Sequence, residues 1–217
     1  MSVRESPTTR LALIRHAPTD WNLRKWIQGQ TDTRLVPEGR TLARTWGRRL
    51  QGQAWDRILA SDLDRALESA RLVNLSLNIP IHRDHRLREQ DWGGWTGRSV
   101  AQLRAETPEA LAEQEAAGWE FRPPGGENRL ELLARSRQAL DEAARNWPGQ
   151  TILVVTHEGV IKSLLYHLAG RRYQPDEPSL IRPYHLHWLD YRRCRLQIRQ
   201  VNALALPIVG GARPGPE

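Results

Sequence analysis

Cysteine is almost absent from this sequence: Cys194 is the one thiol among 217 residues. A single cysteine excludes an internal disulfide and any metal site built from several cysteines. Because Cys194 stands in an alternating run near the end of the chain, we expect it to pack in a strand rather than to act as a nucleophile. No apolar run approaches the ~18 residues of a membrane span, so no membrane partner is expected.

Signals for secretion and for nucleic-acid binding are missing as well. Residues 1–10 are polar and hold no apolar core of a signal peptide, so we expect a cytoplasmic protein. The net charge is +7, but the arginines are spread along the chain among 25 carboxylates, without zinc-finger spacing, an RNP-like aromatic motif or a basic arm. We therefore expect no nucleic-acid binding. A positive field that attracts an anionic substrate explains the charge.

The chain is organised around a short apolar run that ends in Arg15 and His16. Residues 11–14 are apolar and predict a buried strand, which Pro18 ends because it has no amide hydrogen for a sheet ladder. Ligands bind at the carboxyl ends of strands in open α/β sheets. An arginine fork matches phosphate oxygens and a neutral imidazole can attack phosphorus, so the pair suits a phosphate site. From this run alone, an ordinary strand end with a solvated arginine and a capping histidine fits equally well.

Strands and helices alternate along most of the chain. The elements expected are strands at 11–14, 57–60, 79–82 and 151–155, helices at 37–50, 63–75, 129–146 and 160–168, and a hairpin over 184–201. This alternation predicts a single α/β domain over 1–217, a three-layer α/β/α sandwich whose central sheet is mainly parallel. Its core would span about 9–201, with loose tails at 1–8 and 203–217.

Two segments interrupt this alternation. Residues 17–36 form a long loop, and about 98–122 form an insertion of two short helices, which we expect to cap the site and to contact the non-phosphate part of a substrate. The pair Ser61-Asp62 is expected to cap the helix that follows it. His185 and His187 share one face of the late hairpin, but with no third ligand nearby no metal site is expected.

Five motifs resemble, in order, those of the histidine phosphatase superfamily, also called phosphoglycerate mutase-like. Residues 15–22, Arg-His-Ala-Pro-Thr-Asp-Trp-Asn, resemble the family signature Arg-His-Gly-Glu-Thr-x-x-Asn. The others are Ser-x-Leu-x-Arg-Ala at 61–66, Leu-x-Glu-x-x-x-Gly-x-Trp-x-Gly at 87–97, Pro-Gly-Gly-Glu at 124–127 and Thr-His-x-Gly at 156–159. The resemblance covers about residues 9–200. It departs from the family at Ala17, Pro18 and Glu158, where the family has Gly, Glu and Gly.

The resemblance implies a catalytic set of five residues. His16 would be the nucleophile, and Glu89 would donate a proton to the leaving oxygen. The residues that would hold the phosphoryl oxygens are Arg15, Arg65 and His157. Asp91 is a local rival to Glu89 as the acid, and on the residues alone both acids could instead pair with the arginines beside them.

The resemblance also implies a substrate-binding set. Its members are Thr19, Asn22, Gln28 and Glu158. Without the resemblance, Asn22 and Gln28 could instead cap local turns, as such side chains readily do. Glu158 adds a negative charge near a phosphate, so it must point away from that phosphate or engage a basic group.

These inferences predict a metal-independent phosphomonoester hydrolase that acts on a small phosphorylated metabolite through a phosphohistidine. It resembles the α-ribazole phosphatase and broad-specificity phosphatase branch, and no cofactor is expected. A cofactor-dependent phosphoglycerate mutase is the alternative. The family's mutases, however, carry Glu-Arg-His-Tyr-Gly and a longer basic insertion where this chain has Glu-Gln-Asp-Trp-Gly at 89–93. A non-catalytic phosphate-binding module is a further alternative, and a homodimer stays open.

Overall fold

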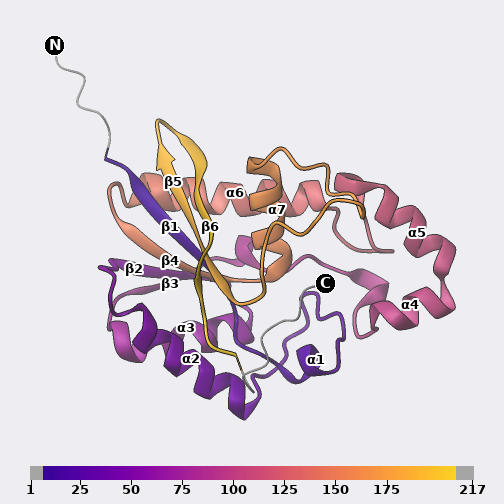
Figure 1. Cartoon of the computed structure of the whole chain (residues 1–217), viewed down its shortest axis with the longest axis horizontal. Helices are drawn as coiled ribbons and strands as arrows, with labels where there is room; N and C mark the ends of the chain where they lie inside the picture. The colour runs from indigo at the N-terminus through magenta and orange to yellow at the C-terminus, as the bar shows by residue number, and fades with distance from the viewer. Residues whose placement is uncertain (1–6, 209–217) are drawn as a thin grey trace.

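A six-stranded sheet forms the centre of the protein, in a computed structural model that describes residues 7–208 (Figure 1). The strands are β1 (Thr9–Arg15), β2 (Arg57–Ala60), β3 (Ile81–Arg83), β4 (Thr151–Thr156), β5 (His185–Arg192) and β6 (Arg195–Ala205). They lie in the order β3-β2-β4-β1-β5-β6. The first four strands in that order are parallel, and the hairpin β5–β6 adds two antiparallel strands. The expected mainly parallel sheet is confirmed.

Two pairs of helices cover the two faces of the sheet (Figure 1). The helices α2 (Pro37–Leu50) and α3 (Asp64–Leu77) pack on one face, and α6 (Arg129–Asn146) and α7 (Glu158–Leu168) pack on the other. Successive residues of a strand point to opposite faces. Within β1, residues 12 and 14 therefore join the core under α2 and α3, whereas 11 and 13 join the core under α6 and α7. The architecture is the expected three-layer α/β/α sandwich.

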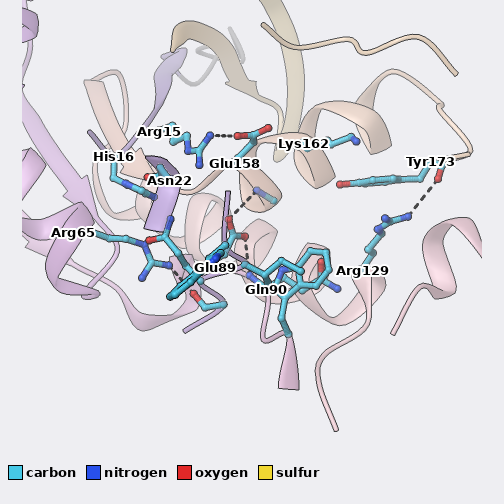
Figure 2. A pocket seen from close by; sticks show the side chains of 16 residues that line it. Arg15, His16, Asn22, Arg65, Glu89, Gln90, Arg129, Glu158, Lys162 and Tyr173 are labelled. Atoms are coloured by element: carbon cyan, nitrogen blue, oxygen red, sulfur yellow. Dashed lines mark hydrogen bonds and ion pairs between the residues drawn. The ribbon is translucent and has the colours of Figure 1, made fainter. Parts of the chain in front are cut away.

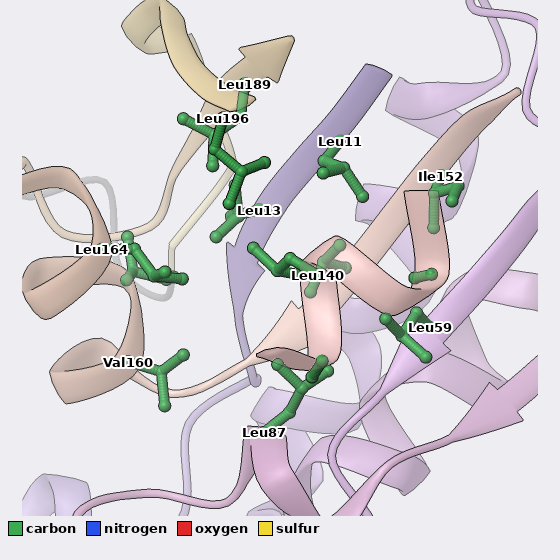
Figure 3. Close-up of a cluster of buried hydrophobic side chains, with 14 of the residues drawn as sticks. Leu11, Leu13, Leu59, Leu87, Leu140, Ile152, Val160, Leu164, Leu189 and Leu196 are labelled. Atoms are coloured by element: carbon green, nitrogen blue, oxygen red, sulfur yellow. The ribbon is translucent and has the colours of Figure 1, made fainter. Parts of the chain in front are cut away.

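The core under α6 and α7 is built almost entirely of aliphatic side chains. Figure 3 shows Leu11 and Leu13 of β1 packed with Leu140 of α6 and Leu164 of α7, all of them without solvent exposure. Burying a leucine side chain stabilises a fold by about 2–3 kcal/mol. This packing fixes the positions of β1 and β4, and with them the positions of the polar residues at the carboxyl ends of both strands.

Three short helices lie beyond the carboxyl ends of the parallel strands. They are α1 (Asp20–Leu23), α4 (Val100–Glu106) and α5 (Pro108–Ala116). The helix α1 lies inside the segment expected to be a loop, while α4 and α5 are the two expected helices of the insertion. Around them Trp95, Leu103, Leu111 and Phe121 form a separate small core. The segments beyond this end of the sheet are therefore stabilised by a hydrophobic core of their own.

The expectations that Ser61 caps a helix and that Cys194 packs in a strand are both wrong. The N-cap of α3 is Leu63, without a side-chain hydrogen bond, because the Ser61 hydroxyl instead contacts His157. The hairpin turns at Arg193 and Cys194, whose φ angles of 48° and 59° suit a two-residue turn of mirror-image type. Cys194 is consequently exposed at a turn and is not packed in a strand.

The tail expected to start at residue 203 is also wrong in its first part. Strand β6 continues to Ala205, and Leu206 is buried under the α2–α3 face of the sheet. At the other end, β1 begins at Thr9 as expected. Residues 1–6 and 209–217 of the expected tails lie outside the described residues.

The late hairpin carries the two histidines that share a face. His187 is buried, and its Nδ1 accepts a hydrogen bond from the Asn202 amide at 3.1 Å. Burial, with the charge of His185, lowers the pKa of His187 to about 4. Within residues 7–208 there is no cluster of three or more His, Cys, Asp or Glu side chains suited to a metal ion. In the same range, no helix is both long and apolar enough to cross a membrane.

Candidate active site

Parallel pairing of β1 with β4 brings two histidines together. Arg15 lies opposite Thr156 in the register, so His16 and His157 follow neighbouring strand ends. The His16 amide donates to the Thr156 carbonyl at 2.9 Å, and the two imidazole centroids are 5.2 Å apart. Two runs separated by 140 residues in the sequence thus form one site at the carboxyl edge of the sheet, where ligands bind in such folds.

The hydrogen bond of His16 defines which of its ring nitrogens can react. Nδ1 lies 2.8 Å from the carbonyl oxygen of Ala17. A carbonyl only accepts, so Nδ1 carries the proton and Nε2 carries the lone pair. Burial, helped by the charges of Arg65 and Arg15, lowers the pKa of His16 well below its usual value. His16 is therefore the neutral imidazole that a nucleophile at phosphorus requires.

His157 is fully buried beside His16. Its Nε2 lies 2.8 Å from the Ser61 hydroxyl, and that hydroxyl already accepts the Leu63 amide at 3.4 Å. Both groups are satisfied when Ser61 donates to Nε2, which leaves the ring proton of His157 on Nδ1. Burial, followed by the charge of Arg65, lowers the pKa of His157 well below its usual value. His157 is thus a neutral hydrogen-bond donor.

Arg65 is held in place by backbone carbonyls rather than by a carboxylate. Its two terminal nitrogens donate to the carbonyls of Thr31 at 2.7 Å and Gly29 at 2.6 Å. Gly29 has a φ of +50°, and a Cβ there would lie 2.9 Å from the Thr96 hydroxyl, so any larger residue would be strained at this position. Burial is the main reason that the pKa of Arg65 falls to about 10, and at neutral pH the side chain is still a cation.

Arg15 forms an ion pair with Glu158, the first residue of α7 (Figure 2). Burial alone would lower the pKa of Arg15, but the neighbouring charges of Glu158, Tyr184 and Glu89 raise it overall. The Tyr184 ring also lies 5.7 Å from the guanidinium. Of the two arrangements open to Glu158, the structure shows the one in which it engages a basic group.

Glu89 faces the histidines from the loop after β3. Its Oε1 accepts the Gln90 amide at 2.8 Å and its Oε2 accepts the Gly159 amide at 3.2 Å. These bonds favour the ionised form, yet burial outweighs them and raises the pKa of Glu89. A carboxyl group with a raised pKa is suited to donate a proton near neutral pH. Asp91 does not line the pocket; its carboxylate accepts the Gly93 amide at 2.9 Å.

The loop that carries Glu89 is anchored by Arg135 of α6. Arg135 donates to the carbonyls of Arg86, Arg88 and Glu89 at 2.6–2.9 Å, and it pairs with the Glu127 carboxylate at 2.6 Å. A guanidinium that bridges three carbonyls and a carboxylate fixes the path of the loop. Sequence reasoning missed Arg135, since nothing in its own helix distinguishes it from other arginines on that face.

Asn22 and Gln28 line the pocket and also make local hydrogen bonds. The Asn22 carbonyl oxygen accepts from the Thr19 amide and hydroxyl, both at 3.0 Å, as part of the capping box of α1. The Gln28 carbonyl oxygen accepts from the Thr33 hydroxyl at 2.6 Å, and the Thr19 hydroxyl oxygen lies 3.1 Å from it. The side-chain group that each can offer a ligand is therefore its amide nitrogen. Thr19 is fully buried beneath them and does not line the pocket.

These residues converge on a pocket of about 290 Å³ (Figure 2). Besides the expected residues and Trp92, its lining includes side chains that sequence reasoning missed: Trp26, Ile27, Gln90, Arg129, Lys162 and Tyr173. None of the lining residues belongs to 98–122, although that segment was expected to contact the substrate. It supports the pocket from behind, because Ile27 and Trp92 pack on its small core.

Three buried nitrogens around His16 have no hydrogen-bond partner within the described residues. They are Arg15 Nε, Arg65 Nε and His157 Nδ1. More than nine in ten buried polar groups in proteins are hydrogen-bonded, so three unpaired donors around one imidazole are a specific feature. Two cations and one neutral donor of this kind suit a ligand that is anionic and rich in acceptors, such as a phosphoryl group.

Comparisons with known proteins show the family of the chain. Residues 11–204 match the family model of the histidine phosphatase superfamily (branch 1). The chain is 37% identical to glucosyl-3-phosphoglycerate phosphatase of Mycobacterium tuberculosis over 164 residues, which cover 71% of this chain and 73% of that protein. It is 34% identical to a 2,3-bisphosphoglycerate-dependent phosphoglycerate mutase of Methylobacterium radiotolerans over 167 residues, which cover 74% and 79%.

Solved structures show the same fold. YhfR of Bacillus stearothermophilus superposes with a TM-score of 0.82 at 28% identity, over 91% of this chain and 98% of that one. The mycobacterial glucosyl-3-phosphoglycerate phosphatase in complex with VO3 superposes with a TM-score of 0.78 at 30% identity, over 90% and 99%. With the family model matching most of its length, the chain belongs to branch 1 of the histidine phosphatase superfamily.

Proposed function

We propose that this phosphatase-family protein hydrolyses small phosphomonoesters through a phosphohistidine on His16, without a metal ion. The observation that supports this most strongly is the pairing of a neutral His16 with three unpartnered donors around it and with Glu89, whose pKa burial raises, nearby. In this arrangement Arg15 and Arg65 neutralise the phosphoryl charge that a metal ion neutralises in other phosphoryl-transfer sites.

In the first step, the Nε2 lone pair of His16 attacks phosphorus and the ester P–O bond breaks. The leaving alkoxide takes the proton of Glu89 and departs as an alcohol. Arg15, Arg65 and His157 hold the equatorial phosphoryl oxygens, where charge is spread in the transition state. The low pKa of His16 keeps its lone pair available for this attack.

In the second step, the ionised Glu89 takes a proton from water, and the resulting hydroxide oxygen bonds to phosphorus while the P–N bond breaks. Orthophosphate leaves, and both His16 and Glu89 return to their starting states. The same carboxyl group thus serves as acid and then as base, as microscopic reversibility requires.

The size of the pocket supports a small substrate. About 290 Å³ lies just below the range for drug-sized ligand sites, which is roughly 300–1,000 Å³. The relatives support the reaction class, because one is a glucosyl-3-phosphoglycerate phosphatase and its solved structure is a complex with VO3.

The test is phosphate release from a panel of monoesters in EDTA by the wild type, His16→Ala and His167→Ala. His167 is an exposed residue of α7 outside the pocket and serves as the matched control. We expect EDTA-resistant turnover in the wild type and the control, none in His16→Ala, and an acid-labile, base-stable phosphoenzyme that only the His16 variant lacks. Retained turnover in His16→Ala would refute the mechanism.

A phosphoglycerate mutase is the second candidate, favoured by the 34% identical mutase relative. A mutase must protect its phosphoenzyme from water long enough to return the phosphoryl group to a second oxygen. Conversion of 3-phosphoglycerate to 2-phosphoglycerate, measured in the same samples with 2,3-bisphosphoglycerate present, separates the two. Isomerisation that exceeds phosphate release would identify a mutase.

A further inference from the structure

Two cations line the pocket at the end away from His16. Arg129 is the first residue of α6, and Lys162 lies in the middle of α7. Figure 2 shows both side chains near Tyr173, on the opposite side of Glu89 and Glu158 from Arg65. Neither cation belongs to the motifs of the resemblance, and the proposed two-step reaction does not use them.

The positive charge at this end of the pocket is not balanced by a carboxylate. Within residues 7–208, Arg129 and Lys162 form no ion pair. The carboxylates whose charges act on them, Glu158 on Lys162 and Glu115 on Arg129, pair with other arginines, Glu158 with Arg15 and Glu115 with Arg104 at 3.8 Å. Burial lowers the pKa of both cations, and for Lys162 the charge of Arg129 adds to this. A partly buried charge without a counter-charge lowers the stability of the fold, so its presence indicates a role in binding an anionic ligand.

Tyr173 holds the two cations in place. Its ring centroid lies 3.9 Å from the Arg129 guanidinium carbon and 4.9 Å from the Lys162 ammonium nitrogen. Arg129 also donates to the carbonyls of Gly118 at 2.7 Å and Tyr173 at 3.4 Å. Tyr173 has a φ of +66°, a costly conformation for a bulky residue that persists only where the surroundings enforce it. The ring and these carbonyls thus fix the Arg129 guanidinium at the wall of the pocket.

We infer that Arg129 and Lys162 form a subsite for a second anionic group of the substrate, a carboxylate or a second phosphate. The inference rests on the proposed function, because it assumes that the first anionic group is the phosphoryl group beside His16. The substrate class is then a phosphomonoester with two anionic ends. The Arg129 fork and the Lys162 point charge supply the complementary donors.

The test compares two ligands that differ in one group. 3-Phosphoglycerate has a carboxylate where glycerol 3-phosphate has a hydroxymethyl group. Binding of both to His16→Ala is measured by calorimetry, so that the result does not depend on turnover. We expect 3-phosphoglycerate to bind roughly 10- to 100-fold more tightly, as one or two charge-assisted hydrogen bonds imply. Fructose 1,6-bisphosphate against fructose 6-phosphate tests a second phosphate in the same way.

The variants Lys162→Gln and Arg129→Gln, each made in the His16→Ala protein, should abolish that preference while binding of glycerol 3-phosphate changes less than threefold. Lys162 makes no hydrogen bond within the described residues, so its variant is the safer of the two for folding. Lys25→Gln is the matched control, because Lys25 is the other lysine and is exposed.

The outcomes separate the two proposals. Preference for 3-phosphoglycerate alone assigns a carboxylate, and preference for the bisphosphate alone assigns a phosphate. Equal binding within both pairs, or equal weakening of every ligand by Lys162→Gln, would overturn the subsite. Preference that is intact in a wild-type protein without any phosphate release would overturn the proposed function and leave the subsite standing.

Discussion

Gly159 is the residue at which a single methyl group tests the role of Glu89. A Cβ at this position would lie 2.3 Å from Glu89 Oε1 and 3.2 Å from its carboxyl carbon, whereas ordinary contact begins at 3.4 Å. The Gly159 amide also donates to Oε2. In Gly159→Ala, Oε1 must therefore move by roughly 1 Å, and a displacement of that size at a reacting group costs about 100-fold in rate.

The loss should depend on the leaving group. An alkyl phosphate needs the proton of Glu89, whereas p-nitrophenyl phosphate leaves as a stabilised phenolate and needs it far less. We expect kcat for glycerol 3-phosphate to fall about 100-fold and kcat for p-nitrophenyl phosphate to fall less than tenfold. The Tm should not fall by more than 2 °C, because alanine is the better helix former by about 1 kcal/mol. Gly52→Ala, with nothing within 4 Å of its Cβ, is the control. Equal losses for both substrates would refute this role of Glu89.

Three further perturbations follow from the site and the core. Burial raises the pKa of Glu89 and lowers that of His16. We therefore expect kcat/KM to be greatest on the acid side of neutrality and to fall as pH rises through the Glu89 pKa. A profile of kcat/KM that climbs steadily from pH 5 to 9 would contradict this. Glu158→Gln removes the negative charge beside Arg15, so the Ki of orthophosphate as an inhibitor of phosphate release should fall roughly 3- to 10-fold. A higher Ki would show that Glu158 mainly positions Arg15. Leu140→Ala in the core should lower the free energy of unfolding, measured in urea, by about 2–5 kcal/mol. Leu130→Ala is the control, because Leu130 is exposed, and it should change that free energy by less than about 0.5 kcal/mol. Equal effects of the two substitutions would place Leu140 outside the core.

The parts of the fold that could be predicted from the sequence are those whose signal is local. Residues 151–155 are a continuous apolar run, and 129–146 repeat apolar residues at helical spacing after Asn128, which caps the helix. Both elements match the prediction to within a residue. The prediction that Ser61 caps the next helix is wrong because its hydroxyl bonds to His157, which lies 96 positions away in the sequence. Similarly, Cys194 is in a turn because of the register between β5 and β6, which only the assembled sheet determines.

The candidate site divides in the same way. The end of the pocket near His16 consists of residues within motifs, and the structure brings His16, Arg65, Glu89 and His157 together there. The far end could not be predicted, because Arg129, Lys162 and Tyr173 stand on three separate elements without a motif. One signal was present: the 16 residues from Ala169 to Tyr184 carry no helix or strand, and long segments of this kind in compact domains are usually functional.

The charges of the pocket connect these two ends. Near His16, the cations Arg15 and Arg65 face two carboxyl groups, Glu158, which pairs with Arg15, and Glu89, whose pKa burial raises. Burial also lowers the pKa of His16 and His157, so neither histidine adds positive charge. At most one net positive charge therefore remains beside His16, which does not balance a phosphomonoester dianion. Arg129 and Lys162 supply two further positive charges at the far end of the pocket. A second anionic group of a substrate would meet those charges, which is the electrostatic reason to look for substrates that are anionic at both ends.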